Sequence, residues 1–255
     1  MEQKDILNRN RAYWDEYADN WFGVSALPEY GAFTPTENEL KLFDDVSGKK
    51  LLEICCGSGH SLKYHADRGA KELWGLDISK SQLENADRYL KENGVSAKLI
   101  CAPMEVNAGI PTDYFDMVYY IYGIGWSTDL QGTFNRIASY LKKGGTFIFC
   151  WGHSLHYCAA WSPEKQTDVP ADGKMYLTKS YLDEEYFTIP IDGGEMILRN
   201  RKISTYVNAL ANAGFVIERM VEETDSETMN AVDPDDRRKK AQMVPHTVIF
   251  KARKL

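Results

Sequence analysis

The sequence lacks any hydrophobic run long enough to cross a membrane. Nowhere in the 255 residues is there a stretch near the roughly 20 apolar residues that a spanning helix needs. The first residues, Met1 to Asp5, are polar and contain no apolar core of a signal peptide. We therefore expect a protein with no membrane segment, located in the cytoplasm.

Cysteine is sparse and follows no recognisable spacing. The chain has five cysteines and no Cys-x-x-Cys pair. This pattern predicts reduced thiols, as in cytoplasmic proteins, and neither a disulfide scaffold nor a zinc site. Cys55 and Cys56 are adjacent, but two neighbouring cysteines alone do not provide the ligand spacing of a metal site. We expect no bound metal.

An excess of positive charge is absent too. The chain has 37 Asp and Glu against 30 Lys and Arg, a formal net charge of -7. This balance argues against a large nucleic-acid footprint. The basic run Arg237 to Lys240 is expected to form the solvated face of a short helix, with Asp233 as its N-cap and Pro234 at the first position. The expected partner is a small molecule, with no nucleic acid and no membrane, and the protein is expected to be a monomer or a homodimer.

The chain has a glycine-containing turn but lacks the third glycine of the dinucleotide fingerprint. Leu51 to Ile54 reads as a buried strand, and Gly57 and Gly59 follow in a turn that opens a helix. The fingerprint Gly-x-Gly-x-x-Gly, which places a diphosphate on the helix N-terminus, would need glycine where Leu62 stands. An NAD(P)-dependent oxidoreductase is therefore the less favoured alternative, and no Tyr-x-x-x-Lys pair supports it.

Two acidic residues accompany this turn. Glu53 lies inside the apolar strand, where a carboxylate is costly unless it has a partner. Asp77 ends the next apolar run, Leu73 to Asp77. A carboxylate at the carboxyl end of a parallel strand can accept hydrogen bonds from ribose hydroxyls, although Asp77 could instead cap the following helix. The pattern indicates a nucleoside-binding crevice.

Strands and helices alternate along the chain, which is typical of an α/β protein with a doubly wound, mostly parallel sheet. We expect seven strands, the last of them antiparallel and at an edge, in a single domain over residues 1–255 with helices in residues 1–48. The expected strands cover residues 51–55, 72–77, 97–101, 115–121, 146–151, 215–221 and 247–252, and the expected helices cover 3–22, 37–45, 60–68, 80–93, 130–141 and 204–213.

The alternation stops over residues 152–200, which we expect to form an inserted cap above the carboxyl ends of the strands. This segment contains a hairpin candidate, residues 186–191 and 195–199 around Asp192-Gly193-Gly194. It is rich in aromatic residues. Such a composition suits either a lid over a reaction site or a dimer interface.

The glycine turn resembles motif I of the class I S-adenosylmethionine-dependent methyltransferases. The resemblance extends to Phe115-Asp116-Met117-Val118 on the expected fourth strand and to the late elements 200–206 and 213–215, which are similar to those of small-molecule members of the ubiquinone and menaquinone biosynthesis type. The chain departs from motif I by carrying Cys55 where glycine is common and Ser58 in place of threonine.

The resemblance implies S-adenosylmethionine as cofactor and in-line methyl transfer to a small molecule. It assigns Glu53 to orienting the turn, Gly57 and Gly59 to close approach of the backbone, and Asp77 to the ribose. The other residues expected to contact the cofactor are Trp14, Tyr17, Cys55, Ile78, Pro103, Met104, Glu105 and Tyr120.

A base is needed only if the acceptor is protonated at neutral pH. His153, which follows the expected fifth strand, is the best placed candidate because the pKa of a histidine lies near neutrality. A non-catalytic module that only binds the cofactor remains an alternative. The aromatic residues near the expected mouth, Tyr122, Trp126 and Trp151 among them, favour a flat or apolar acceptor.

Overall fold

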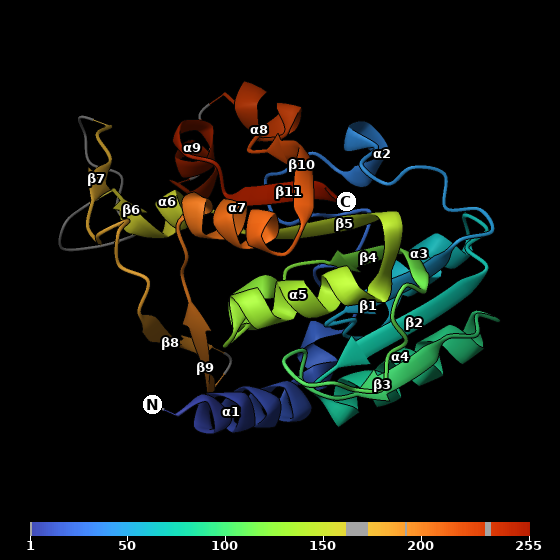
Figure 1. The fold of residues 1–255 in the computed structure, drawn as a ribbon. Helices are drawn as coiled ribbons and strands as arrows, with labels where there is room; N and C mark the ends of the chain where they lie inside the picture. The colour runs from blue at the N-terminus through green and yellow to red at the C-terminus, as the bar shows by residue number, and fades with distance from the viewer. Residues whose placement is uncertain (1, 162–172, 192, 233–235) are drawn as a thin grey trace.

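The computed structural model describes residues 2–161, 173–191, 193–232 and 236–255 (Figure 1). Its main element is a seven-stranded sheet in the order β10-β11-β5-β4-β1-β2-β3. The strands are β1 (Lys50–Ile54), β2 (Glu72–Asp77), β3 (Lys98–Cys101), β4 (Phe115–Tyr120), β5 (Leu141–Gly152), β10 (Phe215–Val221) and β11 (Thr247–Lys254). Strands β1 to β5 pair in parallel, whereas β11 is antiparallel to both of its neighbours. The predicted fold class is confirmed.

The sequence pattern predicted that the last strand lies at an edge of the sheet, and this prediction is wrong. β11 lies between β5 and β10, and Val248, Ile249 and Phe250 are fully buried. β10 forms the edge instead, and Val216 on it is 47% exposed. Alternation along one strand shows which residues share a face, but it carries no information about which strands pair on its two sides.

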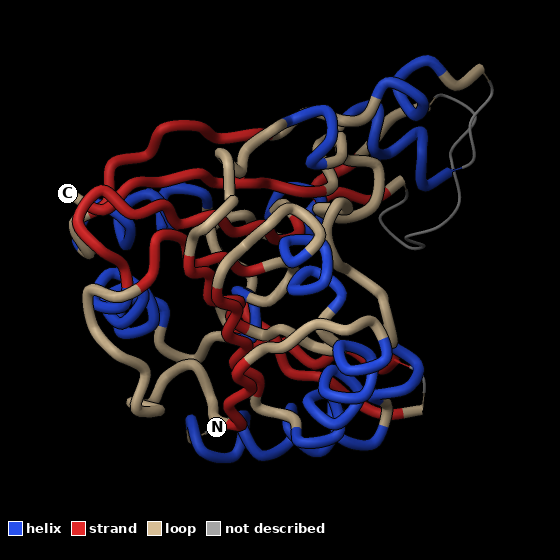
Figure 2. Tube along the Cα trace, turned by 90° about the vertical axis from the view of Figure 1, so that its right-hand side faces the viewer, coloured by secondary structure: helices blue, strands red, loops and turns tan. Residues whose placement is uncertain are grey.

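Helices cover both faces of the sheet (Figures 1 and 2). Alternate strand residues belong to two separate cores, so that Val118 and Phe147 pack on one face while Met117 and Ile148 pack on the other. Helices α5 (Leu130–Tyr140) and α7 (Ile203–Asn212) cover the first face, and α3 (His60–Ala66) and α4 (Lys80–Glu92) cover the second. A sheet that is buried on both faces explains the nearly continuous apolar runs of its strands.

The N-terminal region contains α1 (Gln3–Glu16), the 3-10 helix η1 (Ala18–Trp21) and α2 (Glu37–Leu40). The expected helix over residues 3–22 is therefore an α-helix followed by a 3-10 turn. The prediction of a helix over residues 37–45 is wrong beyond Leu40. The helix ends there because Lys41 has a left-handed conformation with φ 50°.

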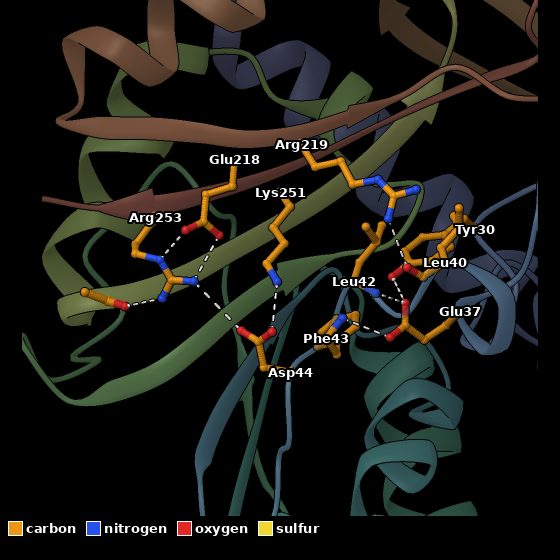
Figure 3. A network of polar contacts seen from close by, with 11 residues as sticks. Tyr30, Glu37, Leu40, Leu42, Phe43, Asp44, Glu218, Arg219, Lys251 and Arg253 are labelled. Atoms are coloured by element: carbon orange, nitrogen blue, oxygen red, sulfur yellow. Dashed lines mark hydrogen bonds and ion pairs between the residues drawn. The ribbon is translucent and has the colours of Figure 1, made fainter.

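Glu37 explains why α2 ends so early (Figure 3). Its buried carboxylate accepts hydrogen bonds from the backbone N–H groups of Leu42 and Phe43, both at 2.9 Å, and from the Tyr30 hydroxyl at 2.6 Å. Arg219 donates to the carbonyl of Leu40 at 3.1 Å. These hydrogen bonds satisfy the backbone groups of the chain outside a helix, and the one from Arg219, 179 residues away, cannot be seen in the local sequence pattern.

The segment after β5 begins with α6 (Ser154–Cys158) and β6 (Ala159–Ala160), which pairs with β7 (Tyr176–Leu177). The predicted hairpin is confirmed as β8 (Tyr186–Ile191) and β9 (Gly194–Arg199). It stands on α1 (Figures 1 and 2), where the buried Asn10 side chain donates to the carbonyl of Ile197 at 2.8 Å and accepts from its N–H at 2.9 Å.

Two short helices, α8 (Ser226–Asn230) and α9 (Asp236–Met243), precede β11. The predicted cap at Asp233 and Pro234 lies outside the described residues. The basic run is only partly solvated: Arg237 is exposed, whereas Arg238 to Lys240 are half-buried. No helix in the described part of the chain is long and apolar enough to cross a membrane.

His65 on α3 gives the fold a defined sensitivity to acid. Both ring nitrogens are buried and have no hydrogen-bond partner among the residues that the structure describes, and the ring packs against Phe43, Tyr64 and Tyr119. Burial lowers the pKa of His65 to about 3. The unfolded chain therefore binds one more proton below the ordinary histidine pKa of about 6.5, and stability falls as the pH drops.

We expect His65→Phe to remove this part of the acid sensitivity. Between pH 7 and pH 5 the wild-type protein should lose about 2 kcal/mol more unfolding free energy than the variant, because that is the cost of keeping one histidine neutral down to pH 5. Urea denaturation at the two pH values measures it. Equal losses in both proteins would show that His65 does not contribute.

Candidate functional site

A cavity of about 270 Å³ opens at the carboxyl ends of the parallel strands. Glu53 and Asp77 line it from the ends of β1 and β2, and Tyr122 lines it just after β4. Trp14 of α1 and Met196 of the hairpin close the opposite side. The carboxyl edge of an open parallel sheet, where loops diverge on either side, is the usual binding position in doubly wound folds.

The glycine turn forms one wall of the cavity. Cys55, Gly57 and Gly59 have positive φ angles of 53°, 48° and 79°. Gly57 lines the cavity, whereas a Cβ atom at Gly59 would lie 3.2 Å from the Cβ atom of Ala86 on α4. The two glycines therefore have different tasks, because Gly57 gives a ligand access to the backbone and Gly59 lets α3 pack on α4.

Glu53 is buried, with 3% of its surface exposed. It accepts a hydrogen bond from the Tyr119 hydroxyl at 3.3 Å and makes a second one with Ser61 at the start of α3. Burial raises the pKa of Glu53 well above its ordinary value. Glu53 thus links the start of α3 to β4 while it lines the cavity.

Asp77 holds the other side of the turn. Its Oδ2 atom accepts from the N–H of Gly57 at 3.0 Å, and its Oδ1 atom accepts from the N–H of Ser79 at 2.9 Å. Burial raises the pKa of Asp77 to about 6. Asp77 is not the N-cap of α4, because Ser79 holds that position and its Oγ atom accepts from the N–H of Gln82.

The charged side chains of the cavity are all acidic. Among the described residues that line it, Glu53, Asp77 and Glu105 are carboxylates, and none is lysine or arginine. Two buried oxygens also have no hydrogen-bond partner in the described structure, Oε1 of Gln82 and Oε2 of Glu105. A cavity of carboxylates and free acceptors suits a ligand that carries positive charge and hydrogen-bond donors, and it does not suit a diphosphate.

Most of the residues predicted to contact a cofactor line this cavity. Those that do are Trp14, Glu53, Cys55, Gly57, Asp77, Ile78, Pro103, Met104 and Glu105. Tyr17, Gly59 and Tyr120 are not among its lining residues. Tyr17 stacks on Tyr13, with ring centroids 4.8 Å apart, beside Gly193 of the hairpin. Tyr120 is fully buried behind the wall, where its hydroxyl contacts the sulfur atoms of Met104 and Cys55.

The structure does not bring His153 to the cavity. Its Nε2 atom lies 2.7 Å from Oε1 of Glu222, and its Nδ1 atom accepts from the N–H of Leu155 at 3.1 Å. Both ring nitrogens are thus engaged, and the side chain caps α6. We assign no proton transfer to His153.

Sequence reasoning missed several residues that line the site. Gln82 lies on the buried side of α4, and a polar residue on the apolar face of an amphipathic helix is a signal that was available. His60 directly follows the glycine turn, and its Nδ1 atom lies 3.0 Å from Oγ of Ser58. No local signal placed the hairpin residues Ile189 and Met196 on this cavity.

Several known proteins are similar to this chain in sequence and in structure. A model of the family described as methyltransferase domain matches residues 51–145. An uncharacterized protein of Haemophilus influenzae is 28% identical over 191 residues, which cover 72% of this chain and 73% of that protein. The ubiquinone biosynthesis O-methyltransferase of Idiomarina loihiensis is 28% identical over 156 residues, or 58% and 62% of the two chains. A solved S-adenosylmethionine-dependent methyltransferase of Mesorhizobium loti superposes with a TM-score of 0.69 at 22% identity, covering 84% of this chain and 95% of that one.

The family match over residues 51–145, the relatives named as methyltransferases and the shared fold together support a class I S-adenosylmethionine-dependent methyltransferase. The match to a methyltransferase domain and the relatives named as methyltransferases, one of them as S-adenosylmethionine-dependent, indicate an enzyme with S-adenosylmethionine as its cofactor. The matched residues 51–145 include the glycine turn, Asp77 and Glu105, so the family match and the acidic cavity concern the same part of the fold.

The residues of this methyltransferase fit the cofactor chemically. S-adenosylmethionine carries a sulfonium and an ammonium group, two ribose hydroxyls and an adenine amino group, all of which favour anionic or accepting partners. The cavity offers the carboxylates of Glu53 and Asp77 and the unpartnered oxygens of Gln82 and Glu105. A Cβ atom added at Gly57 would lie 3.8 Å from Oε1 of Gln82, and no other atom of the described residues beyond the adjacent ones would lie within 4 Å, so the glycine leaves this face of the turn open.

Proposed function

We propose that this methyltransferase transfers a methyl group from S-adenosylmethionine to a small-molecule acceptor that binds in the same cavity. The observation that carries the proposal is the all-acidic set of charged side chains around the cavity, at the carboxyl edge of the sheet. The relative from Idiomarina, named as a ubiquinone biosynthesis enzyme, supports an acceptor of low molecular weight. We further propose that residues 1–255 form one domain, in which the segment 152–200 serves as the acceptor cap.

In this proposal the two buried acids, Glu53 and Asp77, bind different parts of the cofactor. Asp77 accepts hydrogen bonds from the ribose hydroxyls, and Glu53 orients the glycine turn and faces the amino group of the methionine part. Pro103, Met104 and Glu105 follow β3 and line the cavity where the adenine edge would lie. Trp14 presents an aromatic ring to the cavity, and an aromatic face attracts a nearby cation.

Catalysis then depends mainly on alignment. When bound, S-adenosylmethionine supplies a methyl group that is already activated by the adjacent sulfonium. The protein has to hold the acceptor in line with the bond to that methyl group, and such positioning can lower a barrier by several kcal/mol, up to ~7–11 in favourable models. The hairpin residues Ile189, Ile191 and Met196 cover the cavity and exclude water from it.

Calorimetry with four ligands tests the cofactor assignment. We expect S-adenosylmethionine and S-adenosylhomocysteine to bind, while NAD and NADP give no signal, because no lysine or arginine is among the described residues that line the cavity and could bind a diphosphate. A screen of metabolite classes with S-adenosylmethionine labelled in its methyl group then tests transfer. Binding of NAD without binding of S-adenosylmethionine would overturn the proposal, and cofactor binding with no transfer to any class would favour a non-catalytic module.

A further inference from the structure

The half of the cavity away from the glycine turn is apolar and aromatic. We call it the acceptor half. The described residues that line it come from α1, the 3-10 helix η2 (Ile124–Trp126), β5, α6 and the hairpin. They are Leu7, Asn10, Trp14, Trp126, Trp151, Tyr157, Ile189, Ile191, Met196 and Leu198. None of these side chains is charged, so desolvating an ionised acceptor here would be costly.

The aromatic rings form a continuous wall. The ring centroids of Trp14 and Trp126 are 5.3 Å apart with an interplanar angle of 89°, and those of Trp126 and Trp151 are 5.7 Å apart at 80°. Edge-to-face pairs of this kind hold each other in place. The wall favours a flat, apolar molecule.

Two glycines make room for this wall. A Cβ atom at Gly125 would lie 1.9 Å from the Trp151 ring, and a Cβ atom at Gly152 would lie 2.6 Å from the ring and from the hydroxyl of Tyr157. Neither glycine has a positive φ angle. Glycine is therefore needed at these two positions because it leaves space for the aromatic side chains. The space beside Gly152 is where the Tyr157 ring lies.

Tyr157 supplies a hydroxyl group to the acceptor half. The Asn10 side chain is occupied by both backbone groups of Ile197. The hydroxyl of the neighbouring Tyr122 lies 3.2 Å from Nδ1 of His246 and 3.0 Å from Oγ1 of Thr247. No residue in the described ranges makes a hydrogen bond with the Tyr157 hydroxyl. Burial raises the pKa of Tyr157 to about 12, so the hydroxyl is protonated at neutral pH and can donate.

We propose that the acceptor half binds an uncharged, flat, largely apolar molecule with at least one oxygen atom, and that the Tyr157 hydroxyl recognises that oxygen. This inference rests on the proposed function, since it concerns the acceptor of the same methyl transfer. Tyr157 acts as a specificity-determining residue: the apolar wall selects the ring system, and the phenol fixes its orientation. A molecule without an oxygen atom leaves the buried Tyr157 hydroxyl without a hydrogen bond, and it therefore binds more weakly.

The test uses 2-naphthol, naphthalene and 2-naphthoate as probes on protein saturated with S-adenosylhomocysteine. We expect 2-naphthol to bind about five- to tenfold more tightly than naphthalene, the difference that one neutral hydrogen bond makes. The anion 2-naphthoate should bind at least about tenfold more weakly than 2-naphthol, because no described residue of the acceptor half is cationic. Tyr157→Phe should weaken 2-naphthol about five- to tenfold and leave naphthalene within about twofold.

Tyr176→Phe is the matched control, because Tyr176 belongs to the same segment, is 39% exposed and does not line the cavity. It should leave all three affinities unchanged. The inference is overturned if 2-naphthol fails to bind wild-type protein, if 2-naphthoate binds equally well, or if Tyr157→Phe leaves the preference for 2-naphthol intact while its melting temperature equals that of wild type. In each of these cases S-adenosylhomocysteine still binds, and only the inference about the acceptor fails. If S-adenosylhomocysteine itself does not bind, the proposed function fails.

Discussion

Asp77→Ala should weaken the affinity for S-adenosylhomocysteine at least tenfold. The substitution removes the carboxylate that we assign to the two ribose hydroxyls, and hydrogen bonds to a charged group contribute about 1.5–3 kcal/mol each. It also removes the acceptor of the Gly57 N–H group, so the glycine turn loses its link to β2. Isothermal titration calorimetry, performed well below the melting temperature, measures the affinity.

Loss of stability has to be separated from loss of the ribose contacts. Alanine at position 77 leaves the N–H groups of Gly57 and Ser79 without their acceptor, and each loss costs about 1–3 kcal/mol if the group stays buried. Asp225→Ala is the matched control, because Asp225 accepts from the N–H of Thr228 at 2.7 Å as the cap of α8 and does not line the cavity. It should lower stability and leave the affinity unchanged. An affinity of Asp77→Ala within twofold of wild type would place the ribose elsewhere.

The same assignment predicts the pH dependence of cofactor binding. Because burial raises the pKa of Asp77 to about 6 in the free protein, lowering the pH through 6 protonates the group that must accept hydrogen bonds from the ribose. The affinity should therefore level off above pH 7 and fall below pH 6. The raised pKa of Glu53 acts in the same direction, so Asp77→Asn should make the affinity depend less steeply on pH without removing the dependence. If the cofactor affinity of Asp77→Asn depends on pH as steeply as that of wild type, the role assigned to Asp77 is wrong.

Shortening the hairpin should abolish methyl transfer while cofactor affinity stays within about threefold of wild type. Thr188 and Ile197 are direct cross-strand partners, so an Asn-Gly turn can join them in place of residues 189–196. This change removes Ile189, Ile191 and Met196 from the cavity but keeps Ile197, the partner of Asn10 on α1. We expect transfer of labelled methyl to fall at least about a hundredfold, because the acceptor loses both its wall and its protection from water.

Glu195→Ala is the control within the hairpin, since Glu195 is exposed and does not line the cavity. It should retain wild-type transfer. If the shortened protein folds but no longer binds S-adenosylhomocysteine, the hairpin belongs to the nucleoside site and the proposed division of the cavity is wrong. If it keeps transfer but changes from a dimer to a monomer, the segment serves as an interface instead of a lid.

Much of the cofactor side of the site could be predicted from the sequence. The glycine turn, Glu53 and Asp77 stand at the ends of two apolar runs, and the carboxyl ends of neighbouring parallel strands meet at one edge of a sheet. Few arrangements of such a pattern are possible once the sheet is parallel. This is why Glu53 and Asp77 face one cavity, as expected.

The acceptor side required the tertiary structure. Asn10 and Ile197 are 187 residues apart, and the hairpin covers the cavity because these two residues bind each other. His153 looked like a base from its position after β5, but Glu222, 69 residues away, engages its ring. No spacing rule connects such pairs.

By itself the sequence determined the sheet, the turn and the two acids, because these depend on periodicity and on the conformations that glycine alone adopts readily. Tertiary structure decided where α2 ends, which strands flank β11, and which aromatic residues face the acceptor. Those outcomes depend on hydrogen bonds and packing between distant segments, such as Arg219 with the carbonyl of Leu40 or Trp14 with Trp126. Their energies are gained only when the whole chain has folded, so no local window of the sequence contains them.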